Sequence, residues 1–118
     1  MSHPVTARPE LLDYIVFFET EPIWVSPEGW YHGMRFEIQR GEDRVLATLA
    51  PEEGEFAVAW WQGERLRLRM NAVQLSGWEI DTKDGRELLR VRPLQDHLKF
   101  CELQLRPHVR VEWATEWS

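Results

Sequence analysis

Histidine, cysteine and carboxylate side chains are the usual metal ligands, and two pairs of them lie four residues apart. The pairs are His108 with Glu112 and His97 with Cys101. This spacing places two ligands on one face of a helix, but the segment of His108 and Glu112 alternates like a strand, and no third ligand at a recognisable spacing supports His97 and Cys101. Zinc sites use paired motifs of short spacing, and the sequence contains none. The sequence therefore predicts no metal site.

Cys101 is the only cysteine and the first candidate for a nucleophile. It alternates with Leu103 and Leu105, so we expect it to face the core, where a thiol is weakly reactive. No serine lies in a nucleophile elbow, and no glycine-rich phosphate loop is present. An enzyme that uses His32 or His97 as a base is the weakest hypothesis. We expect a non-enzymatic protein without a cofactor.

Three arginines at alternate positions form a candidate anion-binding stripe: Arg65, Arg67 and Arg69. On one strand face, their guanidinium groups suit carboxylate or phosphate, and they could stack on an indole such as that of Trp61. An anionic small ligand or an acidic segment of a partner would fit them. The alternative is a charged outer face that pairs with glutamates and discourages aggregation.

Seven tryptophans are more than a chain of 118 residues needs for its core. Trp60, Trp78 and Trp113 fall on the apolar side of their segments, and we expect them in the core. The other four lie in loops, in a turn or near the C-terminal end. With a neighbouring tyrosine they form the candidate aromatic binding patch: Trp24, Trp30, Tyr31, Trp61 and Trp117. Such residues either cap an open barrel or anchor an interface.

The elements that must position these residues are strands. Apolar side chains alternate from residue 34 to 92, with turn signals about every ten residues. The pattern predicts that Val45–Leu49 returns opposite Met34–Ile38 and that Phe56–Trp60 follows as the third strand. These three strands then share one apolar face.

The turn after Trp60 decides the next register. A three-residue loop that ends at Gly63 gives this glycine the left-handed position of a bulge. Phe56 then lies opposite Leu68, and Val58 lies opposite Leu66.

Asp84 and Gly85 form a strong hairpin signal. This turn predicts that Ile80 lies opposite Leu89. It also places Glu79 opposite Arg90 on the outer face.

Two segments leave alternatives open, and a third is expected to be largely irregular. Residues 11–18 suit either a central strand covered on both faces or a short helical turn from Pro9 that leads into a strand. Residues 99–113 form either one strand bent at Pro107 or two strands with a turn there. The segment from Pro22 to His32 is expected to be a loop with at most a short edge strand.

The pattern predicts an all-β fold with little helix, in one domain over residues 1–118 with a flexible tail over 1–8. We expect an antiparallel meander of eight to nine strands, as a closed or half-open barrel or, alternatively, a two-sheet β-sandwich. The meander is similar to calycin-like barrels, which implies a small apolar ligand. Their Gly-x-Trp signature is not reproduced, because Gly29 directly precedes Trp30 and Gly77 directly precedes Trp78.

Charge narrows the classes of partner. Twenty acidic residues against fourteen basic ones give a net charge of −6. Nucleic acid and anionic membranes need a basic footprint, so neither is expected as a partner. The lone cysteine and the N-terminal sequence, which does not resemble a signal peptide, lead us to expect a cytoplasmic protein.

These features favour a protein-binding accessory protein of the inhibitor or immunity type, and a homodimer is compatible with them. The alternative is a calycin-like barrel that binds an apolar or anionic small ligand. A closed cavity lined by Phe36, Val58, Trp60 and Trp78 would favour the barrel. A flat aromatic patch would favour the protein partner.

Overall fold

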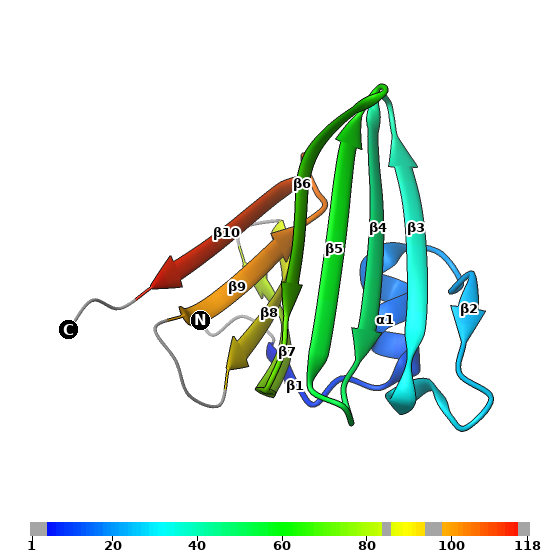
Figure 1. Cartoon of the computed structure of the whole chain (residues 1–118), viewed down its shortest axis with the longest axis vertical. Helices are drawn as coiled ribbons and strands as arrows, with labels where there is room; N and C mark the ends of the chain where they lie inside the picture. Colours follow the sequence, from blue (N-terminus) through cyan, green and yellow to red (C-terminus); the bar gives the residue numbers. More distant parts are fainter. Residues whose placement is uncertain (1–4, 84–85, 94–97, 116–118) are drawn as a thin grey trace. The chain divides into compact units, whose positions relative to one another are not determined.

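The structure, a computed structural model, describes residues 5–83, 86–93 and 98–115. The chain is divided into two compact units. The terminal unit contains residues 1–17 and 75–118, and the central unit contains residues 18–74. Each unit holds one five-stranded antiparallel sheet (Figure 1). The all-β prediction is confirmed, with two sheets.

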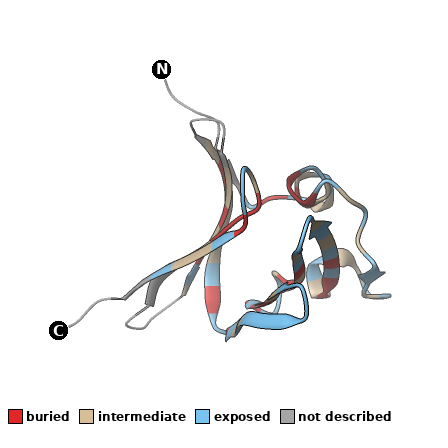
Figure 2. Ribbon diagram, turned by 90° about the horizontal axis from the view of Figure 1, so that it is seen from above, coloured by how far each residue is buried: buried red, intermediate tan, exposed pale blue. Residues whose placement is uncertain are grey.

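The central sheet is a meander in the order β2-β3-β4-β5-β6. Its β3–β4 and β4–β5 registers are those predicted, with Phe36 opposite Ala47 and Ala47 opposite Val58. One face is buried and the other is largely polar, so buried and exposed residues alternate along the strands (Figure 2). The bounds of its strands are Trp24–Val25, Met34–Arg40, Asp43–Ala50, Glu55–Gln62 and Arg65–Ala72 for β2 to β6.

The predicted β5–β6 register is wrong by four residues, and the predicted face is right for Leu68, opposite Trp60, but not for Leu66, which lies opposite Trp61 and is exposed. Phe56 lies opposite Ala72, and Val58 lies opposite Met70. Gly63 has the expected left-handed φ of 59°, but β5 continues to Gln62, so the turn lies later than predicted. A bulge at Trp60 and Trp61 then restores the parity of the two strands.

The terminal sheet has the order β1-β7-β8-β9-β10. Ile80 lies opposite Leu89, and Glu79 lies opposite Arg90, as the hairpin signal predicted. The signal itself, residues 84–85, lies outside the described residues. The bounds of its strands are Val5–Ala7, Leu75–Lys83, Arg86–Pro93, Leu98–Gln104 and Arg110–Thr115 for β1, β7, β8, β9 and β10.

The meander does not close into one barrel, because β7 pairs with β1 and β8 instead of continuing from β6. Gln74, between β6 and β7, has a left-handed φ of 57°. The short strands β1 and β2 raise the number of strands to ten in the described part of the chain. β1 also uses Val5–Ala7, which the sequence placed in a flexible tail.

Residues 99–113 form two strands, the second alternative, and residues 11–18 are helical throughout, without the strand that the second alternative included. Leu11–Phe18 form the helix α1, and the backbone N–H of Glu10 donates to Oδ2 of Asp13 at 2.8 Å, as in a capping box. The turn around Pro107 separates two paired strands, β9 and β10. The last residue of α1, Phe18, stacks on Phe36 at 4.3 Å between ring centroids.

Cys101, Leu103 and Leu105 are buried as predicted. Trp113 is not, since its exposed fraction is 49%. It has the same parity as Cys101 but lies on β10, the last strand of the terminal sheet, so only one neighbouring strand covers it. Val91, opposite Cys101, is the last β8 residue paired with β9.

Candidate protein-binding surface

The short edge strand β2 presents apolar side chains to solvent. Ile23, Trp24 and Val25 are exposed by 57%, 44% and 38%. The strand is held on β3 by backbone hydrogen bonds, with the N–H of Ile23 donating to the carbonyl of Arg35 at 2.8 Å. The segment is therefore ordered although its side chains are not buried. The aromatic patch predicted from the sequence did not include Ile23 and Val25. Their positions directly before and after Trp24 could have indicated them.

The indole of Trp24 lies over the backbone of Gly33. A Cβ atom at Gly33 would come within 2.8 Å of Cζ3 of the ring, so glycine is needed for this approach. The guanidinium carbon of Arg35 also lies over the ring, 5.7 Å from its centroid and within cation–π range. Both contacts restrict the position of the Trp24 ring in the free protein.

A single turn of 3-10 helix, η1 (Trp30–His32), lies next to β2 and carries the other aromatic side chains. The rings of Trp30 and Tyr31 meet edge to face, with centroids 5.7 Å apart. Tyr31 is 42% exposed, and its ring lies so close to Gly29 that a Cβ there would be 2.8 Å from Cε1. Gly29 also has a φ of 131°, which only glycine adopts readily.

The turn between β4 and β5 anchors η1. The backbone N–H of Glu52 donates to the carbonyl of Tyr31 at 2.8 Å, and Nδ1 of His32 lies 2.7 Å from Oε1 of Glu53. The hydrogen bond with Glu53 raises the pKa of His32, and the charges of Glu53, Glu28 and Glu52 act in the same direction. Carboxylates therefore surround this cluster.

We call this surface the aromatic end: Ile23, Trp24, Val25, Trp30 and Tyr31. Both of its segments lie where β3 begins, because Val25 pairs with Met34 and η1 ends next to Gly33. It combines exposed aromatic rings, a rigid backbone and a rim of carboxylates. These are the properties of an interface anchor in which aromatic residues contribute most of the binding energy.

The aromatic patch predicted from the sequence is only partly assembled. Trp24, Trp30 and Tyr31 come together, but Trp61 lies opposite Arg44 toward the other end of the sheet, roughly 20 Å from Trp24 when the spacings along and across the strands are combined. The guanidinium of Arg44 stacks over its ring at 4.2 Å. Trp61 is also part of β5 and not of a turn. Trp117 lies outside the described residues.

The predicted arginine stripe is also split. All three residues are exposed on β6, but Arg69 pairs with Ala59 and Arg65 pairs with Gln62. Ala59 and Gln62 point to opposite faces of the sheet. Arg65, opposite Gln62, therefore lies on the other face from Arg69, opposite Ala59. The bulge causes this difference, because one extra residue reverses the alternation. Arg69 lies opposite Ala59 on the polar face, and Arg67 has no partner on β5 because it is the extra residue of the bulge.

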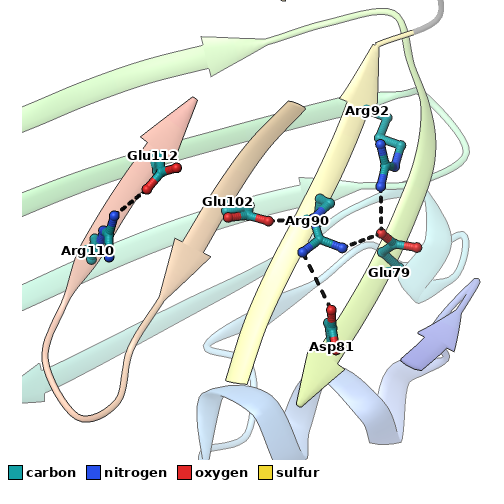
Figure 3. A network of polar contacts seen from close by, with 7 residues as sticks. All are labelled: Glu79, Asp81, Arg90, Arg92, Glu102, Arg110 and Glu112. Atoms are coloured by element: carbon teal, nitrogen blue, oxygen red, sulfur yellow. Dashed lines mark hydrogen bonds and ion pairs between the residues drawn. The ribbon is translucent and has the colours of Figure 1, made fainter. Parts of the chain in front are cut away.

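The terminal sheet carries a different polar surface, an ion-pair network centred on Arg90 (Figure 3). Arg90 lies between Glu79 and Glu102 in adjacent strands, at 2.7 and 2.5 Å, and Asp81 is 3.5 Å away. Arg92 adds a second contact to Glu79 at 3.1 Å. The hydrogen bond from Arg90 lowers the pKa of Glu79. These charges are largely neutralised within the sheet.

The other candidates for chemistry are dispersed. Burial raises the pKa of the Cys101 thiol to about 11, which keeps it protonated at neutral pH. Within the residues that the structure describes, no three histidine, cysteine or acidic side chains are grouped to hold a metal ion. In the same residues, no helix is long and apolar enough to span a membrane.

Comparison with known proteins gives a likeness of fold. No protein-family model and no curated protein sequence matches the chain. The structure is similar to a chain from a "Contact-dependent growth inhibition toxin - immunity protein complex from Klebsiella pneumoniae 342". The TM-score is 0.79 at 16% sequence identity, over 90% of this chain and 93% of the other.

Proposed function

We propose that this chain is a non-enzymatic, immunity-type protein that binds a toxin domain and blocks its action. The observation that carries this proposal is the aromatic end, where exposed rings are held rigidly at the edge of a sheet. The likeness of fold to a chain from a toxin–immunity complex supports the choice of partner. The net charge of −6 suits association with a basic protein.

The geometry suits tight binding because little freedom remains to be lost. Trp24 is held between Gly33 and Arg35, and Tyr31 lies against Gly29. Side chains that are already ordered lose less conformational entropy when a partner covers them. The rim of carboxylates around His32 would guide the approach of a basic surface and fix its orientation.

A growth assay tests the proposal. The chain is co-expressed with each toxin domain of the contact-dependent growth inhibition systems of its own host. We expect it to restore growth against one of them and to co-purify with that toxin domain. If the chain is soluble and abundant yet restores growth in no pairing, the proposal is wrong.

Matched variants connect this activity to the surface. The double variant Trp24→Ala/Tyr31→Ala removes the two exposed rings of the aromatic end, and we expect it to lose protection. Trp113→Ala removes an equally exposed ring from the terminal sheet and should protect like the wild type. Equal protection by both variants would place the binding surface elsewhere.

A further inference from the structure

A glutamine of the terminal sheet has a buried acceptor without a hydrogen bond. Gln104, on β9, is only 2% exposed. Its Nε2 donates to the carbonyl of His108 at 3.0 Å, and this bond fixes the orientation of the amide group. Oε1 is buried as well, and no group among the described residues donates to it. Buried side-chain oxygens almost always accept a hydrogen bond, so this atom is suited to a donor from outside the chain.

Gln104 lines a hollow on the face of the terminal sheet that carries the Arg90 network. The hollow has a volume of about 250 Å³, and its described lining consists of Leu88, Glu102, Gln104, Arg110 and Glu112. All of these residues belong to the terminal unit and come from the adjacent strands β8, β9 and β10. Leu88 and Arg110 lie opposite Gln104, on either side of it. One sheet therefore supplies every described wall of the hollow.

Two glutamates of this lining lie directly opposite each other, which is unfavourable for like charges. Each carboxylate contacts one arginine through Oε2: Glu102 contacts Arg90 at 2.5 Å, and Glu112 contacts Arg110. Figure 3 shows Glu102 between Arg90 and Glu112, with a contact to Arg90 alone. Neither Oε1 atom bonds to a residue in the described part of the chain. With Oε1 of Gln104, the hollow thus offers three oxygen atoms that can still accept.

A primary ammonium group matches these acceptors. It has one positive charge and three N–H donors, and it accepts no hydrogen bond. The apolar side chain of Leu88 can contact the alkyl chain that carries the ammonium group. The guanidinium of Arg110 lines the same hollow, and it repels a divalent metal ion twice as strongly as a single charge. Because Arg110 is already bonded to Glu112, its charge is largely offset for a monovalent ligand.

We infer that this hollow is a binding site for a small organic cation, a free alkylammonium ion. Its N–H groups donate to Oε1 of Gln104 and to the Oε1 atoms of Glu102 and Glu112. The positive charge then lies between the two glutamates and reduces their repulsion. Arg90 and Arg110 keep their contacts with the Oε2 atoms. The site is separate from the aromatic end, to which toxin binding is assigned, so it is tested on the free protein.

The test titrates the protein with n-butylammonium and follows the NMR signals of the amides. We expect shifts that saturate at the side-chain amide of Gln104 and at the backbone amides of residues 102–104 and 110–112. The affinity should fall as salt is raised, because the contact is between charges. Butyrate and 1-butanol have the same alkyl chain length without the positive charge, and they should leave these signals unchanged.

A pair of variants with the same change of charge locates the contact. Glu112 and Glu37 are each paired with one arginine, Arg110 and Arg44, and their side chains are exposed by 45% and 42%. Glu112→Gln removes a charge from the hollow and should weaken butylammonium binding by about tenfold. Glu37→Gln makes the same change on the central sheet and should alter the affinity by less than about twofold.

A third variant tests the buried amide. Gln104→Met keeps a side chain of similar size and removes Oε1, so it should weaken butylammonium binding by about fivefold or more. Circular dichroism checks that the variants are folded. If Gln104→Met does not fold, the comparison of Glu112→Gln with Glu37→Gln decides.

Three results would overturn the inference. The first is butylammonium that leaves the signals around Gln104 unperturbed, as expected if a water molecule is the donor to Oε1. The second is an equal loss of affinity in Glu112→Gln and Glu37→Gln, which would indicate net charge alone. The third is binding of the peptide acetyl-Gly-Lys-Gly-amide at least about tenfold more tightly than butylammonium, which would make a lysine side chain of a protein the ligand.

Discussion

The polar surfaces of the terminal and central sheets differ in how their arginines are paired. On the terminal sheet, Arg90 is bonded to carboxylates from both neighbouring strands, and only 18% of its side chain is exposed. On the central sheet, the guanidinium groups of Arg67 and Arg69 are exposed without ion pairs among the described residues. The same sheet exposes the rings of Trp24 and Tyr31.

This difference separates a stabilising surface from a binding surface. A charge that already has its partners gains little from a new one, and the network around Arg90 stabilises the sheet itself. Side chains that are ordered but unsatisfied can still gain from association. We therefore place toxin binding on the central unit and stability on the terminal network. The comparison predicts which variants lose folding and which lose binding.

The largest effect is expected from Arg90→Met. Glu79, Asp81 and Glu102 would keep their charges in a partly buried site with little compensation, at a cost of about 2–4 kcal/mol in the free energy of unfolding. Urea unfolding measures the loss. Arg69→Met is the control and should change the free energy by less than about 0.5 kcal/mol. Equal losses would remove the distinction between the two surfaces.

Trp24→Ala should have the opposite effect to Arg90→Met, with a loss of binding and little loss of stability. We expect it to weaken toxin binding by about 2 kcal/mol or more, the range of an interface anchor. Its free energy of unfolding should stay within about 1 kcal/mol of the wild-type value, because the ring is already exposed. Calorimetry and urea unfolding measure the two quantities. A large loss of stability without a loss of affinity would assign Trp24 to the fold.

Gly33→Ala tests the rigidity of the aromatic end. The φ of Gly33 is 166°, which any residue adopts, so the substitution does not strain the backbone. Its Cβ would instead push the indole of Trp24 out of place. Toxin affinity should fall, but by less than in Trp24→Ala, while the free energy of unfolding changes by less than about 1 kcal/mol. Unchanged affinity would mean that the position of the ring is unimportant.

The smallest effect is the pH dependence of the His32–Glu53 contact. The folded-state pKa of His32 is raised, so its stabilisation is complete below the ordinary value of about 6.5 and is lost as pH rises through the folded value. An NMR titration should place the midpoint of His32 above about 6.5. Glu53→Gln should lower it, and an unchanged midpoint would show that this carboxylate does not act on His32.

Local pairing in both sheets could be predicted from the sequence. Between Met34 and Trp60 the apolar alternation leaves one register that puts the large apolar side chains on one face, and that register is observed, with Met34, Phe36 and Phe56 fully buried. A one-residue slip would expose the whole face, so the burial energy selects it strongly. The hairpin with Ile80 opposite Leu89 follows from the same constraint.

Features that depend on distant contacts or on one inserted residue could not be predicted. The bulge at Trp60 and Trp61 moves the β6 register, turns Arg65 to the other face and leaves Leu66 exposed, and the apolar alternation of the sequence does not indicate it. The meander ends at Gln74 because the next strand, β7, pairs with β1 and β8, and this pairing depends on residues that are distant in the sequence. At the candidate site, tryptophans in a proline- and glycine-bounded loop indicated the aromatic end, but not that Trp61 lies far from it.

Hydrogen exchange on the complex with the neutralised toxin domain tests the central claim most directly. If binding uses the aromatic end, amides of residues 22–33 and of the adjoining turn at 50–54 should exchange more slowly in the complex than in the free protein. Amides of residues 79–91 and 101–112, around the Arg90 network, should exchange as before. Protection of the terminal network with no change at the aromatic end would contradict the account.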